Sequence, residues 1–374
     1  MKSLIYADNA ATTQMDTMAF EAMKPYLLQE YGNASQLYSF ARQPKKAIKE
    51  AREIIASCIG ALPEEIYFTS GGTESDNWAI KGTTCRNSDH CLTITTAFEH
   101  HAVLYTCNAI ERLGYPVEYM YPDQNGTITP AILNRYITDE TFLVSVMYAN
   151  NEIGSIQPIK ELSAIAHARG ALFHTDAVQA VGHAKIDVND LDVDLLSASS
   201  HKFNGAKGVG FLFIRNGTPI TSYADGGAQE RGLRAGTENV AGIVSMAAAL
   251  KHNVDNLEKN RQHVLDLEKR LIEGLTAGKV IFVRNGGENT LPGIISLSFP
   301  NADGEAIMHR LDLMGIAVST GSACNSSSTE VSHVLKAINL DDCLAKGTIR
   351  ISLGKDNTED HVDAIVAGLI RIMK

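Results

Sequence analysis

Short apolar runs alternate with helical segments through most of this chain. The runs have the character of buried strands, and they occupy residues 66–68, 92–94, 142–147, 171–173 and 195–196. Segments with helical periodicity, such as Lys45–Ile59 and Lys160–Gly170, lie between them. This alternation predicts an α/β fold with a mainly parallel sheet covered by helices on both faces. The run 208–214 follows a turn too short for a parallel crossover, so this strand is expected to be antiparallel.

The chain is long enough for two domains. Its 374 residues exceed the roughly 250–300 residues that one hydrophobic core usually serves. After residue 250 the pattern changes to a long charged helix, expected over Val254–Leu275. Further strands and helices are expected at 293–299, 303–313, 348–353 and 361–373. We expect a large domain at residues 15–253 and a small α+β domain formed by residues 1–14 and 254–374.

Composition excludes several classes of protein. The net charge of −10 and the lack of a basic block argue against a nucleic-acid surface. No apolar run approaches membrane-spanning length, and a charge follows the first residues too soon for a signal peptide. The six cysteines include no CxxC pair, which argues against a zinc knuckle or a disulfide framework. A cytoplasmic location with reduced thiols is expected.

Two segments, His174–Gln179 and Ser197–Gly210, place an aspartate and a lysine at the ends of strand-like runs. A lysine such as Lys202 can form an imine with the aldehyde of pyridoxal phosphate. A carboxylate such as Asp176 can keep the pyridine nitrogen of that cofactor protonated. The pair therefore indicates a pyridoxal phosphate site, although an isolated lysine beside a capped strand would normally be a solvated residue.

Lys207 is an alternative to Lys202 as the cofactor lysine. It lies in a turn between Gly205 and Gly208, whereas Lys202 is expected to end its strand directly. A firmly held lysine suits the role better. Ser199 and His201 are expected to project to one face of the same strand end, where they can meet a phosphate.

The segment Thr69–Asp76 lies between a strand and an expected helix. Paired glycines let the backbone approach a ligand, and free amides at a helix start attract phosphate. The alternative is a capping box between Thr73 and Asp76, which needs no ligand. His174 and Asp176 also permit a metal site, but no further ligand has a recognisable spacing.

Cys324 is the candidate nucleophile among the cysteines. It lies in Ser319–Thr329, a stretch of small polar residues without a periodic apolar pattern. An exposed thiol in such a setting is a hazard unless it is used. Cys58 and Cys91 have the pattern of core residues. The alternative is that Cys324 is an ordinary cysteine of a surface loop.

Taken together, these motifs resemble the NifS/IscS-type cysteine desulfurases of the class-V aminotransferase family, which have the fold-type I architecture. The resemblance covers nearly the whole chain. The matching segments are Tyr6–Thr13, Thr69–Asn77, Glu99–His100, Asn150–Gly154, His174–Gln179, Ser199–Lys202, Gln229–Asn239, Ser319–Cys324 and Ile349–Gly354. It implies a large domain with a seven-stranded, mainly parallel sheet.

The resemblance implies a cofactor role for each matching residue. Lys202 would bind pyridoxal 5'-phosphate, Asp176 would pair with its ring nitrogen, and Gln179 would donate to its ring hydroxyl. His100 would stack on the ring and act as a possible proton shuttle, and Asn151 would contact the cofactor. The phosphate ligands would be Gly72, Thr73, Ser199 and His201, with Thr237 reaching the phosphate of the other subunit of a homodimer.

The resemblance also implies an activity, conversion of L-cysteine to L-alanine. Asn33, Asn151 and Arg350 would bind the substrate, since an arginine suits a carboxylate through its two-pronged geometry. Lys202 would move the α-proton, and Cys324 would take the sulfur as a persulfide. The sulfur would pass to an acceptor protein for iron–sulfur cluster assembly or tRNA thiolation. No intrinsic metal is implied, only a transient contact of Cys324 with a nascent cluster on a partner.

Other functions remain open at this point. A selenocysteine lyase and an aminotransferase would use similar chemistry, and a sulfur-carrier or adaptor protein could keep the fold with an inactive cofactor site. Some positions depart from the family pattern, namely Ala34, Tyr38, Ala41 and Ala206. The sequence ends at Lys374, where the housekeeping relatives continue into an extension that helps to dock a scaffold protein.

Overall fold

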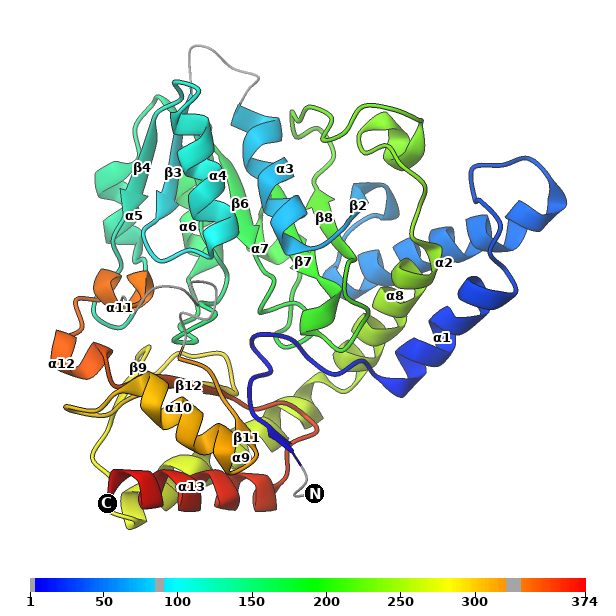
Figure 1. Cartoon of the computed structure of the whole chain (residues 1–374). Helices are drawn as coiled ribbons and strands as arrows, with labels where there is room; N and C mark the ends of the chain where they lie inside the picture. Colours follow the sequence, from blue (N-terminus) through cyan, green and yellow to red (C-terminus); the bar gives the residue numbers. More distant parts are fainter. Residues whose placement is uncertain (1–3, 85–90, 321–330) are drawn as a thin grey trace.

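The computed structural model describes residues 4–84, 91–320 and 331–374, and its largest element is a seven-stranded sheet (Figure 1). Strand β8 runs antiparallel to its neighbours β2 and β7, and the other neighbouring pairs are parallel. The mainly parallel sheet and the reversed strand are as predicted. In spatial order the strands are β2 (Ile66–Thr69), β8 (Gly210–Ile214), β7 (Leu195–Ser199), β6 (Leu172–Asp176), β5 (Thr141–Ser145), β3 (Leu92–Thr96) and β4 (Val117–Met120).

Helices cover both faces of this sheet because successive residues of the buried strands point to opposite sides. Leu195 packs with Trp78 and Val103 of helices α3 and α4, whereas Leu196 packs with the cluster that includes Ile55. Helices α1, α2 and α8 lie together beside the sheet (Figure 1). The helices of this part are α1 (Thr17–Leu28), α2 (Arg42–Ile59), α3 (Gly72–Thr84), α4 (His101–Glu111), α5 (Pro130–Tyr136), α6 (Ile159–His167), α7 (Val188–Leu191) and α8 (Val240–Asp255).

A smaller antiparallel sheet, in the order β12-β10-β9, lies below the large sheet in Figure 1. Its side chains form a separate apolar cluster with helices α9 and α13, in which Leu271 and Ile349 are fully buried. The two-residue strand β1 pairs in parallel with β11, so the first residues lie against this part of the chain. Its elements are β1 (Ile5–Tyr6), α9 (Leu257–Ala277), β9 (Val283–Asn285), β10 (Ile294–Ser298), α10 (Gly304–Leu313), β11 (Ile316–Ala317), α11 (His333–Ala337), α12 (Asp342–Ala345), β12 (Thr348–Ser352) and α13 (Glu359–Met373).

Two local expectations were wrong. The long helix expected over Val254–Leu275 is present as α9, but it begins at Leu257 rather than Val254, because Asn256 leaves helical geometry with φ −110° and ψ 14° and ends α8. Strand β7 ends at Ser199, and Lys202 lies in the short 3-10 turn Ser200–Lys202 rather than ending the strand itself. The division into domains at residues 253 and 254 stays a prediction. No helix in the described parts of the chain is long and apolar enough to cross a membrane.

Candidate cofactor site

A cleft of about 510 Å³ opens at the carboxyl ends of the central parallel strands. Ligands of open α/β sheets commonly bind at this edge. Asp176 ends β6 and Ser199 ends β7, so the two strands bring these side chains together. Arg350 of β12 and the segment Ala10–Thr12 complete the lining. The cleft therefore combines residues from both sheets.

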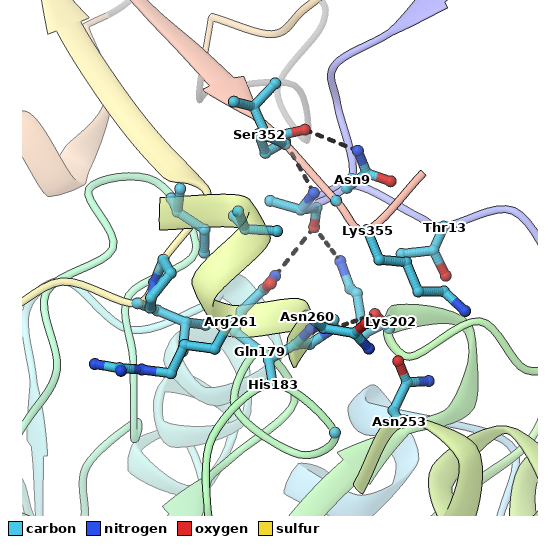
Figure 2. Close-up of a pocket in the computed structure, with 18 of the residues that line it drawn as sticks. Asn9, Thr13, Gln179, His183, Lys202, Asn253, Asn260, Arg261, Ser352 and Lys355 are labelled. Carbon is cyan, nitrogen blue, oxygen red and sulfur yellow. Dashed lines mark hydrogen bonds between the residues drawn. The ribbon is translucent and has the colours of Figure 1, made fainter. Parts of the chain in front are cut away.

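Lys202 reaches into the cleft from its 3-10 turn. Its Nζ donates to the carbonyl oxygens of Ala10 at 2.5 Å and Ala11 at 2.9 Å. Gln179 Nε2 donates to the same Ala10 oxygen at 3.0 Å, so the two side chains converge (Figure 2). His183 Nε2 donates to the backbone oxygen of Lys202 at 2.7 Å, which fixes the turn.

Lys207 also lines the cleft, but it lies in an exposed turn. Because Lys202 is partly buried in a turn fixed by a hydrogen bond, it is the better held of the two lysines. The structure thus supports the choice of Lys202 even though the strand ends earlier than predicted.

Asp176 presents a buried carboxyl group to the cleft. Its Oδ1 accepts a hydrogen bond from the backbone of Val178 at 2.9 Å. Burial raises the pKa of Asp176 to about 6, while the Val178 amide and the charge of Lys202 act in the opposite direction. A protonated ring nitrogen is the type of partner that would favour the ionised form of such a carboxyl group.

The start of α3 forms a cradle for an anion. Helix α3 begins at Gly72, and a Cβ atom there would lie 2.6 Å from Val178 Cγ2. Gly71 has φ +148°, a conformation that favours glycine. Thr73, Ser199 and His201 line the same end of the cleft. The two glycines keep the cradle open for a phosphate at a helix N-terminus.

The capping-box alternative for Thr73 and Asp76 was wrong. The side chain of Asp76 is buried, with Oδ1 3.7 Å from His174 Nε2. At the helix start, the backbone amide of Ser70 instead donates to Glu74 Oε2 at 3.1 Å.

His100 lines the cleft and also caps α4, since its Nδ1 accepts a hydrogen bond from the Ala102 amide at 3.1 Å. Burial, aided by the nearby charge of Lys202, lowers the pKa of His100 to about 4. Burial likewise lowers the pKa of His201 to about 4. Both rings are therefore neutral near neutral pH, and His100 offers an uncharged aromatic face to the cleft.

Arg350 supplies a buried positive charge from the smaller sheet. Its Nη2 donates to Asp8 Oδ1 at 2.7 Å and its Nη1 donates to the backbone oxygen of Asn151 at 2.8 Å. Its buried Nε has no hydrogen-bond partner. Asn151 also lines the cleft. These two predicted substrate residues therefore lie together.

Three predicted site residues are not among those that line the cleft. Thr237 is exposed, and Asn33 Oδ1 accepts a hydrogen bond from the backbone of its neighbour Ser35 at 2.9 Å. Cys324 lies outside the described residues. The individual roles of all the site residues stay predictions.

Sequence reasoning assigned no role to Asp8 and Glu99, and it considered Asp76 only as part of a helix cap. All three lay within motifs that carried the family resemblance, and that placement was their only signal. The metal-site alternative for His174 finds no support in its contacts, because its ring nitrogens lie 2.8 Å from Ser145 Oγ and 3.0 Å from Ser197 Oγ. In the parts of the chain that the structure describes, no three His, Cys, Asp or Glu side chains are grouped to hold a metal ion.

These residues fit pyridoxal phosphate. The cleft provides an amine on Lys202, a buried carboxyl group on Asp176, and a glycine cradle with hydroxyl and amide donors. Cofactor chemistry of this kind needs all three, placed around one ring.

Comparisons with known proteins agree with this fit. The family model described as aminotransferase class-V matches residues 5–365. The cysteine desulfurase IscS of Clostridium botulinum is 45% identical over 380 residues, which cover 100% of this chain and 95% of that relative. The cysteine desulfurase IscS of Methanosarcina thermophila is 47% identical over 363 residues, covering 97% and 90%.

Solved structures are similar as well. A structure described as a NifS-like protein has a TM-score of 0.92 at 38% identity and covers 99% of both chains. A structure described as SspA in complex with cysteine has a TM-score of 0.85 at 35% identity and covers 94% of this chain and 99% of that one. The chain belongs to the aminotransferase class-V family. It is a pyridoxal phosphate enzyme of fold-type I, and the predicted resemblance to NifS/IscS-type cysteine desulfurases is confirmed.

Proposed function

We propose that this chain converts L-cysteine to L-alanine and carries the released sulfur on Cys324. The observation that carries the proposal is the single cleft that joins Lys202, Asp176 and Arg350. An amine, a ring-facing carboxyl group and a buried guanidinium are the groups needed to handle an amino acid on this cofactor. The relatives of similar length are named cysteine desulfurases, and this supports cysteine as the substrate.

Each residue has a task that follows from its position. When bound, pyridoxal phosphate withdraws electrons from the substrate α-carbon. Asp176 holds the ring nitrogen protonated, and Arg350 binds the substrate carboxylate while Asn151 flanks it. Lys202 takes and returns the α-proton as a general base and acid.

Cys324 completes the reaction. As a thiolate it accepts the substrate sulfur, so the carbon–sulfur bond breaks, a sulfur–sulfur bond forms, and alanine leaves. This covalent capture divides sulfur transfer into two easier steps. A persulfide on the protein can then be passed to an acceptor protein.

A homodimer is part of the proposal. A set of large apolar side chains is exposed on α1 and the segment that follows it, and such patches commonly mark protein interfaces. The set comprises Leu27, Leu28, Tyr31, Leu37, Tyr38 and Phe40. The exposed position of Thr237 supports its predicted reach to a phosphate in the other subunit. The cytoplasmic location and an acceptor such as an iron–sulfur scaffold remain predictions from the resemblance.

The test is a single incubation of the purified holoenzyme with L-cysteine. We expect stoichiometric alanine by amino-acid analysis and one added sulfur atom on the peptide that contains Cys324 by mass spectrometry. Added sulfur on Cys58, Cys107 or Cys343 instead, or no alanine, would contradict the proposal. Supplying cysteine and selenocysteine separately to Cys324→Ala separates this activity from that of a selenocysteine lyase, because selenium release depends less on a protein thiol.

A further inference from the structure

Three carboxyl groups form a buried cluster beside the cofactor cleft, and two of them, Asp76 and Asp176, line it. Asp76, Glu99 and Asp176 are 1%, 0% and 5% exposed, and they belong to α3, to the residues before α4 and to β6. The mechanism proposed above uses Asp176 and leaves Asp76 and Glu99 without a task. Like charges in one buried cluster repel one another, so the three groups cannot all be ionised cheaply.

Among the residues that the structure describes, no lysine or arginine pairs with Asp76. The nearest candidate is His174, whose Nε2 lies 3.7 Å from Asp76 Oδ1. The His174 ring is spanned by two hydroxyl groups, with Nδ1 2.8 Å from Ser145 and Nε2 3.0 Å from Ser197. Burial lowers the pKa of His174 to about 3, so the ring is neutral and gives Asp76 no charge to pair with.

The elements packed against α3 supply no other compensating charge. Strands β5, β7 and β8 carry no titratable side chain. Helix α4 contributes Cys107, whose thiol has a pKa raised by burial and stays neutral. Burial has the largest effect and raises the pKa of Asp76, and the charges of Asp176 and Glu99 raise it further. A hydrogen bond from Ser197 acts in the opposite direction without reversing the shift. The positive charge of Lys202 acts on Asp176.

The hydrogen bonds of the cluster also favour neutral carboxyl groups on Asp76 and Glu99. Glu99 Oε1 accepts from the Met147 amide at 2.8 Å and from Thr96 Oγ1 at 2.9 Å, but its Oε2 has no partner. Asp76 Oδ1 is buried and also lacks a partner. An ionised carboxylate in this state would cost several kcal/mol, whereas a protonated carboxyl group would cost far less.

We propose that Asp76 is a positioning residue that holds a proton beneath Asp176, so that the cluster carries its single negative charge on the residue that faces the cofactor ring. A neutral Asp76 places no competing negative charge beside Asp176. The role of Asp76 rests on the proposed function in one respect, the pairing of Asp176 with the cofactor.

The first test compares two asparagine variants of the holoenzyme. The absorption band of the bound cofactor titrates with pH, and removing a real negative charge nearby lowers its midpoint. Asp76→Asn, which replaces a neutral group by a neutral group, should move the midpoint by less than about 0.3 pH units. Asp176→Asn removes a true charge and should move it by about one unit or more. Equal shifts in the two variants would overturn the proposal.

Infrared spectroscopy of the holoenzyme tests the proton directly. The carbonyl band of protonated carboxyl groups should be present at neutral pH, and Asp76→Asn should remove part of it. If this variant fails to fold, the wild-type protein still allows the proposal to be refuted, because absence of the band at neutral pH would contradict it. The measurement does not depend on turnover. A band that is present without alanine formation would therefore refute the proposed function alone.

A third variant separates positioning from charge. Asp76→Leu is neutral and similar in size but loses the hydrogen bond with Ser197, so it should weaken cofactor binding about tenfold, the effect of one lost hydrogen bond. Asp76→Asn should restore most of that affinity in a fluorescence titration. Affinity of the leucine variant equal to that of the wild type would show that Asp76 has no positioning role.

Discussion

The buried carboxyl groups beside the cofactor cleft differ from a buried carboxyl group beside the small sheet. Beside the seven-stranded sheet, Asp76 and Glu99 each keep an oxygen without a hydrogen-bond partner. Beside the small sheet, Glu268 accepts from Arg284 Nη2 at 2.5 Å and from the Gly293 amide at 3.0 Å. The paired carboxylate ties α9 to β9 and to the start of β10, and we interpret it as structural. The unpaired ones surround a cleft that receives a charged cofactor.

This difference in hydrogen bonding shows that a buried carboxyl group can serve stability at one place and function at another. A buried pair that loses one partner destabilises the fold, whereas a cluster arranged around a ligand is satisfied by that ligand. Substitutions in the carboxyl cluster beside the cleft should therefore change chemistry, and substitution of the paired Glu268 beside the small sheet should change stability. The predictions below test this contrast.

Lys202→Ala should have the largest effect, a loss of turnover of about a thousandfold or more, because the residue both binds the cofactor and moves a proton. Turnover is measured as alanine formed from L-cysteine. Lys207→Ala is the matched control from the same cleft and should keep the cofactor absorbance. Near-normal turnover in Lys202→Ala would remove the basis of the site assignment.

Cys324→Ser should also stop alanine formation, because a serine hydroxyl is not ionised near neutral pH and attacks sulfur poorly. Cofactor binding should be unaffected, since Lys202 and Asp176 provide it. The two steps are separated by measuring cofactor absorbance and alanine on the same sample. Cys343→Ser, at an exposed position, is the control and should be fully active. Full alanine production by Cys324→Ser would contradict the sulfur-transfer step.

Glu268→Gln tests the small sheet. It leaves Arg284 without its charged partner and should lower the free energy of unfolding by about 1–3 kcal/mol, measured by urea denaturation. The cofactor absorbance should not change. Lys269→Gln breaks an exposed pair with Glu273 and should cost less than about 0.5 kcal/mol. A Glu268 variant with normal stability and weakened cofactor binding would reverse the proposed contrast.

Glu99 should make the free energy of unfolding depend on pH, and this effect should be smaller than those above. Burial raises its pKa from 4.5 to about 8, so between these values the folded chain holds a proton that the unfolded chain has lost. The free energy of unfolding therefore contains a contribution that declines as pH rises through this window. Glu99→Gln stays neutral throughout and should make the decline shallower by about 1 kcal/mol between pH 7 and pH 8. An unchanged slope would mean that Glu99 does not titrate in that range.

Much of the fold was predictable because strand burial and helix periodicity are local signals. The adjacent apolar residues Leu195 and Leu196 predicted a strand that is covered on both faces. The short turn before Gly210 predicted that the next strand runs antiparallel. The break at Asn256 was not predictable, since charged residues on both sides continue the helical pattern. The turn at Ser200–Lys202 was missed because serine, histidine and lysine fit a strand end equally well.

The site residues could be predicted where the chemistry of the cofactor requires a particular type of residue. Lys202 and Asp176 could be assigned from chemistry, and the structure places both in one cleft. Asp76 could not, because its sequence pattern matches a helix cap and only the packing of α3 reveals its burial. The hydrogen bond between Arg350 and Asp8 joins residues that are 342 positions apart, and no sequence pattern indicates that the two are partners.

The most direct test of the central claim is to reduce the holoenzyme with borohydride, digest it, and locate the cofactor by mass spectrometry. Because Lys202 is the proposed cofactor lysine of the cleft beside the unpaired carboxyl cluster, the peptide that contains Lys202 should carry the reduced cofactor. Cofactor fixed to the peptide that contains Lys207, or to no lysine of this cleft, would contradict it.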